Sequence, residues 1–519
     1  MGKAPLNRRQ FLQLVASGVA AEALLPFCEP ALQAEVAAGL PIAFQDNKVH
    51  LKKRETRQSK SYGSGNFGEW IDDANDLPCF HYTCNQTEDP LAAIPVETAW
   101  RAPTDHTHQI GNDRILAAAS NYGYLQVRQD EGGPKFLNDY HPDSGLFGAG
   151  IGYLTDGSEI LGTYYPGTGT SFERYFGMGY LRKQTTGKNF SVDQTIYAPF
   201  GDDPVLISEV VISSQNPRPS SLYWVEYWGC QSYPFSYTAL AEGYNSAGEI
   251  NPEKVVSLRR ESAQRFAHRF EKTADGLGLL QSSQVAVTTH PVAAGGAVQE
   301  EMAASLPNPS SPAAEATSQA VAPYEAPPAT FLASLDEGPV RFLTNAANFF
   351  GATNVLRHTG PAGPESVPVP AELLHPAGLI HLVPVNVGMA DQPPDDLTAT
   401  GSESALILVK PFTLDAGHSQ TLRFLYGYLP AGFSAAELIT KYRAQAPTLF
   451  ATSSAAWKDE GIQFAVDQDP WVEREVSWHN YYLRSGFTYD DFFAEHIVSQ
   501  GQVYQYCFGF QGAAIVDRA

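Results

Sequence analysis

The side chains best able to do chemistry gather near the end of the sequence. Asp490, Asp491 and Glu495 form the densest group of carboxylates in this region, with His496 and several aromatic residues beside them. Carboxylates accept hydrogen bonds from sugar hydroxyls, and aromatic rings stack on the C–H faces of sugars. If the segment is helical, Asp491 and Glu495 share one face because they are four residues apart. The pattern predicts a sugar-contact site; the simpler alternative is that the aspartates begin a helix after Gly486 and the aromatic residues fill a core.

A second candidate lies at Asp105, His106 and His108. Two histidines two residues apart on a strand would face the same side, as metal ligands do, but no third ligand follows at a usable spacing. We therefore expect a surface loop here, and we predict neither a metal site nor a cofactor. The glycine-rich stretch 63–68 lacks the Lys-Ser/Thr pair of a phosphate loop, and no Gly-x-Ser-x-Gly nucleophile motif stands out.

Cysteine usage gives little support for a disulfide scaffold. Five cysteines, at positions 28, 79, 84, 230 and 507, are too few to hold a chain of 519 residues together. Cys79 and Cys84 could pair and close one small loop. Cys230 and Cys507 lie among apolar and aromatic residues, so we expect them to be buried as small hydrophobic side chains.

Most of the chain carries the alternating pattern of antiparallel strands. Short runs in which apolar and polar residues alternate recur between 51 and 233, separated by Gly, Asn, Asp and Pro. Similar runs return at 378–385, 404–409 and 420–428. We expect the aromatic pairs Tyr223-Trp224 and Tyr227-Trp228 to lie in the sheet core rather than to act as sugar platforms. The fold predicted from these runs is mainly β, with one large antiparallel sandwich over residues 50–430.

A segment of unusual composition interrupts this body. No Lys or Arg occurs between Lys272 and Arg341, and the part from about 285 to 330 is rich in Pro and Ala. Such a segment buries little apolar surface, which favours a flexible insertion. Because strand-like sequence lies on both sides of it, we expect both sides to contribute strands to the same sandwich.

Helical sequence follows the strands. Ser434, with Glu437 three residues later, forms a capping box and predicts a helical linker over 434–460. From about 465 to 519, apolar and aromatic residues again recur at helical spacing, as in Trp471–Leu483. We expect this last region to be the beginning of a further, helical domain.

The first forty residues are typical of an export signal. Arg8 and Arg9 precede Phe11-Leu12 and a short, mildly apolar stretch, as in twin-arginine signals, and this stretch is too short to span a bilayer. We therefore predict a signal peptide over 1–40, a periplasmic or secreted location and no membrane span. With 34 Lys and Arg against 56 Asp and Glu, the net charge of −22 also argues against nucleic acid as a partner.

Short stretches in both halves of the chain resemble a known family. Ala198–Val205 and, upstream, Gly111–Arg114 look like parts of the N-terminal β-supersandwich of cellobiose-phosphorylase-like glycoside phosphorylases and hydrolases. The sequence from Trp478–Tyr482 through Tyr489–His496 to Phe508–Gly512 is similar to the first helix pair of their (α/α)6 barrel, a six-hairpin glycosidase fold. The resemblance implies a galactose-mutarotase-like supersandwich, then a helical linker, then a barrel that begins in region 465–519.

The family's sugar-binding pair has no match in this sequence. In the phosphorylase branch an Arg-Asp pair that holds the sugar follows a Gly-Phe pair, but here Gln511-Gly512 follows Gly509-Phe510, so that pair cannot be carried over. The predicted sugar-contact residues are Asp490, Asp491, Glu495 and Gln511. The catalytic residues stay unassigned, because the family's general acid lies deep in the barrel and has no counterpart before Ala519.

These expectations combine into one functional hypothesis. Cleavage of a glycosidic bond with inversion needs a protonated acid and a second group on the opposite face of the sugar. We expect an exported, carbohydrate-active protein of this family whose ligand is a β-linked oligosaccharide or polysaccharide. Because the barrel looks incomplete, we expect no turnover by this chain alone: either the gene is truncated or split, or a separate chain carries the rest of the barrel. The alternative is a non-catalytic sugar-binding or scaffold protein.

Overall fold

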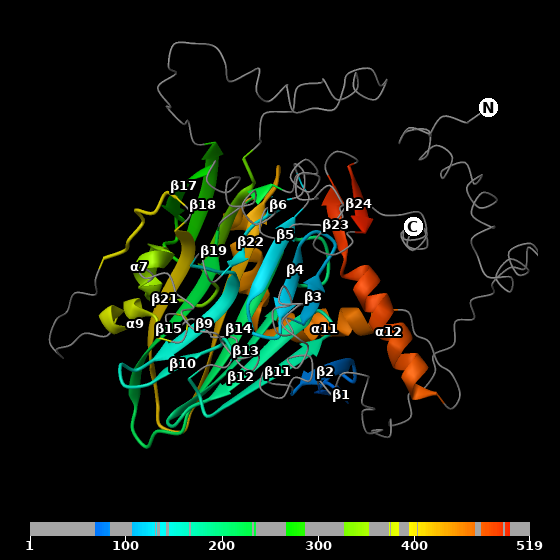
Figure 1. The fold of residues 1–519 in the computed structure, drawn as a ribbon, viewed down its shortest axis with the longest axis horizontal. Helices are drawn as coiled ribbons and strands as arrows, with labels where there is room; N and C mark the ends of the chain where they lie inside the picture. Colours follow the sequence, from blue (N-terminus) through cyan, green and yellow to red (C-terminus); the bar gives the residue numbers. More distant parts are fainter. Residues whose placement is uncertain are drawn as a thin grey trace, which may run out of the picture. The chain divides into compact units, whose positions relative to one another are not determined.

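Two large antiparallel sheets make up most of the structure (Figure 1). The computed structural model describes residues 68–83, 106–230, 233–234, 266–285, 326–351, 373–382, 394–461, 469–490 and 494–498, with short gaps inside some of these ranges. All of them belong to one compact unit, Thr56–Tyr506. The predicted export signal, Cys84, Cys507 and Gln511 lie outside the described residues.

The first sheet joins strands from both ends of the described chain. Its order is β1 (Gly68–Asp72), β2 (Pro78–Tyr82), β11 (Ser171–Gly177), β12 (Tyr180–Thr186), β13 (Phe190–Tyr197), β14 (Val205–Ser214), β22 (Ser419–Leu429), β19 (Ala329–Ser334), β18 (Gly278–Val285) and β17 (Phe266–Lys272). Every pairing along this order is antiparallel. Strands β18 and β19 pair although the Pro- and Ala-rich segment separates them, so the strands on its two sides belong to one sheet.

The second sheet is also antiparallel. Its main path runs β16 (Tyr233–Pro234), β6 (Lys135–Phe136), β5 (Leu125–Gln129), β9 (Ala149–Thr155), β15 (Ser220–Gly229), β21 (Ser404–Leu414) and β20 (Arg341–Asn345). Strand β10 (Ile160–Gly162) pairs with β9, and β3 (Thr107–Gly111) and β4 (Leu116–Ser120) extend the sheet beside β5. A separate small ladder joins β7 (Tyr140–His141) and β8 (Leu146–Phe147).

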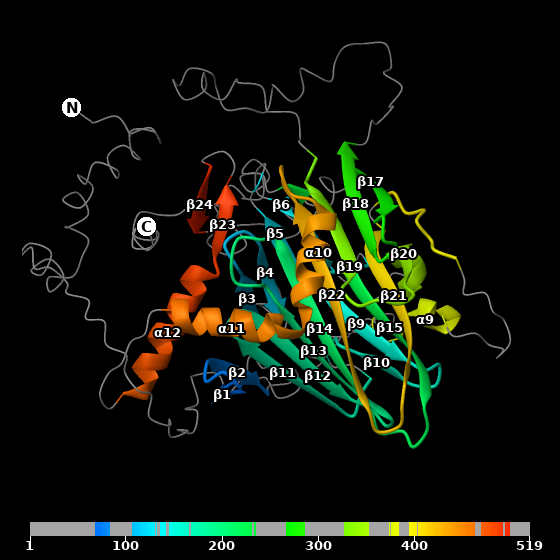
Figure 2. The ribbon, with the colours of Figure 1, turned by 180° about the vertical axis from the view of Figure 1, so that it is seen from behind.

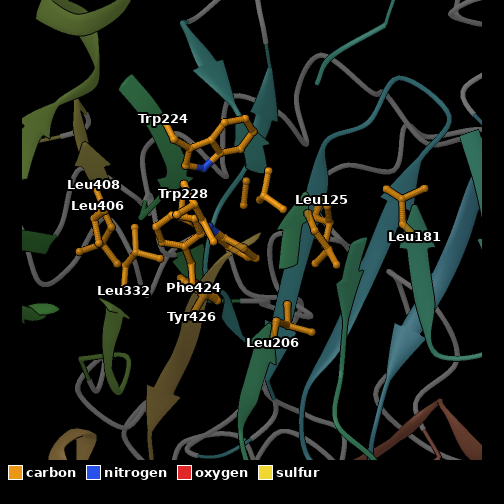
Figure 3. Close-up of a cluster of buried hydrophobic side chains, with 14 of the residues drawn as sticks. Leu125, Leu181, Leu206, Trp224, Trp228, Leu332, Leu406, Leu408, Phe424 and Tyr426 are labelled. Atoms are coloured by element: carbon orange, nitrogen blue, oxygen red, sulfur yellow. The ribbon is translucent and has the colours of Figure 1, made fainter. Parts of the chain in front are cut away.

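The two sheets pack face to face over a large apolar core (Figure 3). Leu206 and Phe424 of the first sheet meet Trp224 and Trp228 of the second in this core. The two tryptophans are fully buried, and Trp228 stacks on Tyr426 with ring centroids 4.1 Å apart. The prediction of a mainly β, antiparallel sandwich is confirmed, as is the core position of these tryptophans.

One predicted strand is a helix. The strand expected over 378–385 coincides instead with α9 (Ala377–Leu382), which lies beside α7 (Ala346–Phe350) over the outer face of the second sheet (Figure 1). Leu379 and Leu382 are buried against Phe349 and Phe350 in a second apolar cluster. A short continuous run of apolar residues fits a buried helix as well as a buried strand, so periodicity alone cannot decide between them.

Helices α10 (Ala435–Gln445) and α11 (Leu449–Glu460), joined by the turn η5 (Ala446–Thr448), cover part of the outer face of the first sheet (Figure 2). Leu438 and Leu449 pack there against Ile207 and Leu425. Helix α10 begins after Ser434 as predicted, but the Ser434 side chain makes no capping hydrogen bond, so the expected capping box is wrong. Among the described residues, none of the helices is long and apolar enough to cross a membrane.

The last described elements are helix α12 (Pro470–Arg484) and a hairpin of β23 (Phe487–Asp490) and β24 (Glu495–Val498). Asp469 caps the start of α12, because its side chain accepts hydrogen bonds from the amides of Trp471 and Val472. The helix ends at Ser485, whose amide bonds back to Tyr481 and Leu483.

Candidate functional site

Two of the four predicted sugar-contact residues, Asp490 and Glu495, lie on the hairpin rather than on a helix. Asp490 ends β23 and Glu495 begins β24, and the two residues are direct partners across the ladder. The helix considered for this segment is therefore absent at Asp490 and Glu495. Helix α12 stops before Gly486, and the following Phe-Thr-Tyr run is typical of a strand. Asp491 and the side chains of Asp490 and Glu495 lie outside the described part of the chain.

The neighbouring pair of the hairpin contacts the sandwich. Tyr489 and His496 are partners across the ladder, and their rings lie edge to face at 5.3 Å. His496 Nε2 lies 2.9 Å from Asp202 Oδ1. The Tyr489 ring lies under the Arg114 guanidinium, which is 4.6 Å from the ring centroid. The hairpin is thus held to the sandwich directly beside the pair Asp490 and Glu495.

Arg114 is the centre of this contact. Its Nε and Nη2 donate to the two carboxylate oxygens of Asp202 at 3.1 and 3.0 Å, and its Nη1 donates to Glu131 at 2.9 Å. The guanidinium also lies 4.9 Å from the ring centroid of Phe433, so aromatic residues contact it as well as carboxylates. Tyr428 donates its hydroxyl to the second oxygen of Glu131 at 2.7 Å. The Arg114 guanidinium can bind two carboxylates and two aromatic rings at once because it is planar and has five N–H donors.

We name this group the Arg114 cluster. Its members come from strands, loops and the hairpin, and they are Arg114, Glu131, Asp202, Tyr428, Phe433, Tyr489 and His496. The Arg114 side chain is 10% exposed, whereas that of Asp202 is 47% exposed. Within the cluster, the Arg114 cation is therefore nearly buried and the Asp202 carboxylate is half exposed.

Two loops from different sheets position Arg114 and Asp202. Arg114 follows β3 of the second sheet, and Asp202 lies between β13 and β14 of the first. Asn112 joins the loops, because its Oδ1 accepts from the amide of Arg114 at 2.9 Å while its Nδ2 donates to the carbonyl of Asp203 at 2.8 Å. The amide of Asp113 also donates to the Gly201 carbonyl at 2.9 Å. The stretches that carry the family resemblance in the sandwich are thus in contact with each other.

The end of helix α12 is tied to the same place. Arg484 donates to Asp113 at 3.0 Å, and Gln109 donates to the Tyr482 carbonyl and the Ser485 hydroxyl, both at 2.9 Å. The helix that leads into the hairpin is therefore fixed to strand β3 and to the loop after it.

His108 is buried in strand β3, so the expected surface loop is wrong. It is 1% exposed, and its ring stacks with Phe176 and with Trp478 of α12. Its Nε2 donates to the Gly177 carbonyl at 2.7 Å, which leaves Nδ1 to accept from the Tyr482 hydroxyl at 3.0 Å. Burial lowers the pKa of His108 to about 4, which keeps the ring neutral. This histidine therefore joins α12 to the sandwich.

The described part of the chain holds no group of three or more His, Cys, Asp and Glu side chains that could bind a metal ion. Cys79 and Cys230 are buried free cysteines, as expected for Cys230, and burial raises the pKa of Cys79 to about 12. Neither thiol is thus set up to act as a nucleophile.

The carboxylates of Asp202 and Asp203, near the hairpin, accept hydrogen bonds from other side chains of the protein and are not arranged for proton transfer. Burial tends to raise the pKa of Asp202, but hydrogen bonds from His496 and Arg114 outweigh burial and hold the pKa below its usual range. Asp203 accepts from Lys441 at 2.5 Å and Tyr442 at 2.6 Å. An ionised, hydrogen-bonded carboxylate is a poor general acid, but it can hold neighbouring elements in place.

No protein-family model matches the sequence, and no curated protein matches it either. Solved structures with some likeness include a kojibiose phosphorylase from the human microbiome, at 7% identity and a TM-score of 0.39 over 81% of this chain and 43% of that one. A polysaccharide lyase has 11% identity and a TM-score of 0.25 over 62% and 32% of the two chains. An aldose 1-epimerase of Escherichia coli has 7% identity and a TM-score of 0.23 over 63% and 100%. The chain thus spans less than half the length of the first two proteins.

Proposed function

We propose that this chain is a carbohydrate-active protein of the glycoside hydrolase and phosphorylase type, which binds an oligosaccharide or polysaccharide through hairpin β23–β24. The proposal depends on one observation: three stretches that resemble cellobiose-phosphorylase-like enzymes, far apart in the sequence, lie in contact. Residues Gly111–Arg114, the loop that holds Asp202, and the segment with Tyr489 and His496 all contact one another in the Arg114 cluster.

The register of the hairpin supports a ligand at this place. Asp490 and Glu495 are direct partners across a short antiparallel ladder. Two acidic residues directly opposite each other destabilise such a ladder, so the stability of the hairpin does not explain them. Carboxylates accept hydrogen bonds from sugar hydroxyls, and the phenol and imidazole on the next pair, Tyr489 and His496, also suit a sugar.

We expect binding without turnover at the Arg114 cluster. A glycosidase or phosphorylase needs a carboxylic acid that is protonated at the start of the reaction. In the described residues of the cluster, Asp202 is held ionised by Arg114 and His496, and Glu131 is bound by Arg114 and Tyr428. These contacts favour the alternative of a non-catalytic sugar-binding protein over a complete enzyme.

Titration of the purified chain with β-linked glucan and chitin oligosaccharides tests the proposal. Calorimetry should detect binding of at least one series, with no release of reducing sugar in water and no sugar phosphate with added phosphate. Absence of binding by every oligosaccharide would refute a carbohydrate ligand. Release of sugar or sugar phosphate would instead refute binding without turnover.

We also propose that the chain is exported through the twin-arginine pathway, on the basis of Arg8, Arg9 and the stretch that follows them. Replacing both arginines by lysine should keep the protein in the cytoplasmic fraction of a bacterial host that has this pathway. The unchanged sequence should be found in the periplasm or the medium. Equal distribution of the two proteins would argue against the signal.

A further inference from the structure

We propose that Asp202 is a positioning residue, which holds hairpin β23–β24 in the geometry needed to bind carbohydrate. The inference rests on the proposed function, because it takes the pair Asp490 and Glu495 as part of the sugar site. It goes further by assigning a role to a residue in a different sheet, far away in the sequence. Asp202 and His496 are 294 residues apart and meet at 2.9 Å.

The hairpin needs such support because it is small. It has two strands of four residues each, and a two-stranded hairpin is marginally stable by itself in water. Its position must therefore come from contacts with other elements. In the pair Tyr489 and His496, the imidazole contacts Asp202 and the phenol ring contacts Arg114.

Asp202 is suited to this role because it binds on two sides. One oxygen, Oδ1, accepts from both Arg114 Nε and His496 Nε2, and the other accepts from Arg114 Nη2. Arg114 is in turn held by Glu131 and is nearly buried, so Asp202 is fixed by a rigid partner on the sandwich side. A carboxylate fixed in this way sets the position of the imidazole that it binds.

The adjacent residue provides a matched control. Asp203 has the same side chain and lies in the same loop, but its carboxylate binds Lys441 and Tyr442 of helix α10 instead of the hairpin. Replacing either aspartate by asparagine removes one charge and keeps the shape. Only the Asp202 change should disturb the hairpin.

Oligosaccharide affinity and amide hydrogen exchange of the full chain test the proposal together. Asp202→Asn should weaken binding by about 3- to 10-fold, a modest effect because the carboxylate is half exposed. The same variant should speed exchange in 487–498 and leave α10 unchanged. Asp203→Asn should change affinity less than about 2-fold and should speed exchange in α10 instead.

A double-mutant cycle adds a readout that a general loss of stability would not produce. His496→Gln should weaken binding about as much as Asp202→Asn, and the double variant should be no weaker than either single variant. Additive effects would overturn the proposal, and so would equal losses from Asp202→Asn and Asp203→Asn.

Sugar binding by the wild type and hydrogen exchange of the hairpin distinguish a failure of the positioning role from a failure of the proposed function. If the wild-type chain binds no sugar, the proposed function fails, while hydrogen exchange still decides whether Asp202 positions the hairpin. If the wild type binds sugar and Asp202→Asn binds it equally well with unchanged exchange in the hairpin, the positioning role fails and the proposed function stands.

Discussion

Low pH should lower the free energy of unfolding of this protein in part because of His108. Replacing this residue should remove its share of the pH dependence. Burial lowers the pKa of His108 from 6.5 to about 4. As the pH falls through 6.5, the unfolded chain takes up a proton at this residue, whereas the folded chain stays unprotonated until the pH approaches 4. Because the unfolded state binds more protons in this window, the free energy of unfolding falls as the pH falls.

The magnitude follows from proton linkage. One such histidine changes the free energy of unfolding by up to about 1.4 kcal/mol per pH unit inside the window, or roughly 2.2 kcal/mol between pH 6.5 and pH 4.5, because the slope is smaller near either pKa. Burial also lowers the pKa of His268 to about 4, so the two histidines together should contribute about twice this loss. The stability that they contribute is fully present above pH 6.5 and is lost toward pH 4.

Urea denaturation at several pH values, followed by tryptophan fluorescence, measures the effect. His108→Phe keeps a flat ring between Phe176 and Trp478 but leaves the Gly177 carbonyl without its donor, so the variant should be less stable at neutral pH. Its disadvantage should shrink by about 2.2 kcal/mol between pH 6.5 and pH 4.5, because residue 108 then has no proton to gain in the unfolded state.

His418 supplies the control for this experiment. It lies exposed in the turn between β21 and β22, so His418→Gln should leave the free energy of unfolding at neutral pH unchanged within about 0.5 kcal/mol, unlike His108→Phe. The reasoning is refuted if the pH curve of His108→Phe is parallel to the wild-type curve within about 0.5 kcal/mol. Such a result would mean that α12 does not cover β3 in solution.

Three further substitutions test the packing of the sandwich. Gly152→Ala should cost about 3 kcal/mol of stability or more, because its Cβ would lie 2.0 Å from the buried Trp224 ring; an unchanged melting temperature would contradict this. Lys183→Met should cost roughly 3 kcal/mol in urea denaturation, because the fully buried ammonium donates to two carbonyls and a hydroxyl. Tyr428→Phe should cost about 1–2 kcal/mol, because the Glu131 carboxylate loses its hydroxyl donor, and equal stability would contradict that bond.

Local pattern was sufficient to predict most of the sandwich. The run Val205–Ile212 lies within strand β14, and buried residues alternate with half-buried ones from Ser208 to Ile212 as a period of two requires. Val205–Ser208 are all buried, because Val205 and Ile207 pack against α10 and α11 on the other face. The helix at Ala377–Leu382 was missed because a short apolar run carries no period. Ser434 marked the correct start of α10, yet the structure makes no use of its hydroxyl.

The site depended on contacts that no local pattern contains. Arg114 and Asp202 are 88 residues apart, and each looks like an ordinary charged loop residue in sequence. The sequence predicts a surface loop at His108 because the partners of this residue, Gly177 and Tyr482, belong to other elements. The sequence names Asp490 and Glu495 as candidates, but it does not show that they lie on strands or that the sandwich holds the hairpin.

The core itself explains how Arg114 can reach a loop of the other sheet. Trp224, Glu226 and Trp228 of β15 face the core together, and the two indoles donate to the Glu226 carboxylate at 2.9 and 3.1 Å. Ser208 of the first sheet also bonds to this carboxylate. A shift of one residue would turn Glu226 to the opposite face and leave it without these donors. The contacts of Glu226 therefore favour one position of strand β15 relative to the first sheet. The position of one sheet relative to the other in turn determines the distance between the loops that hold Arg114 and Asp202.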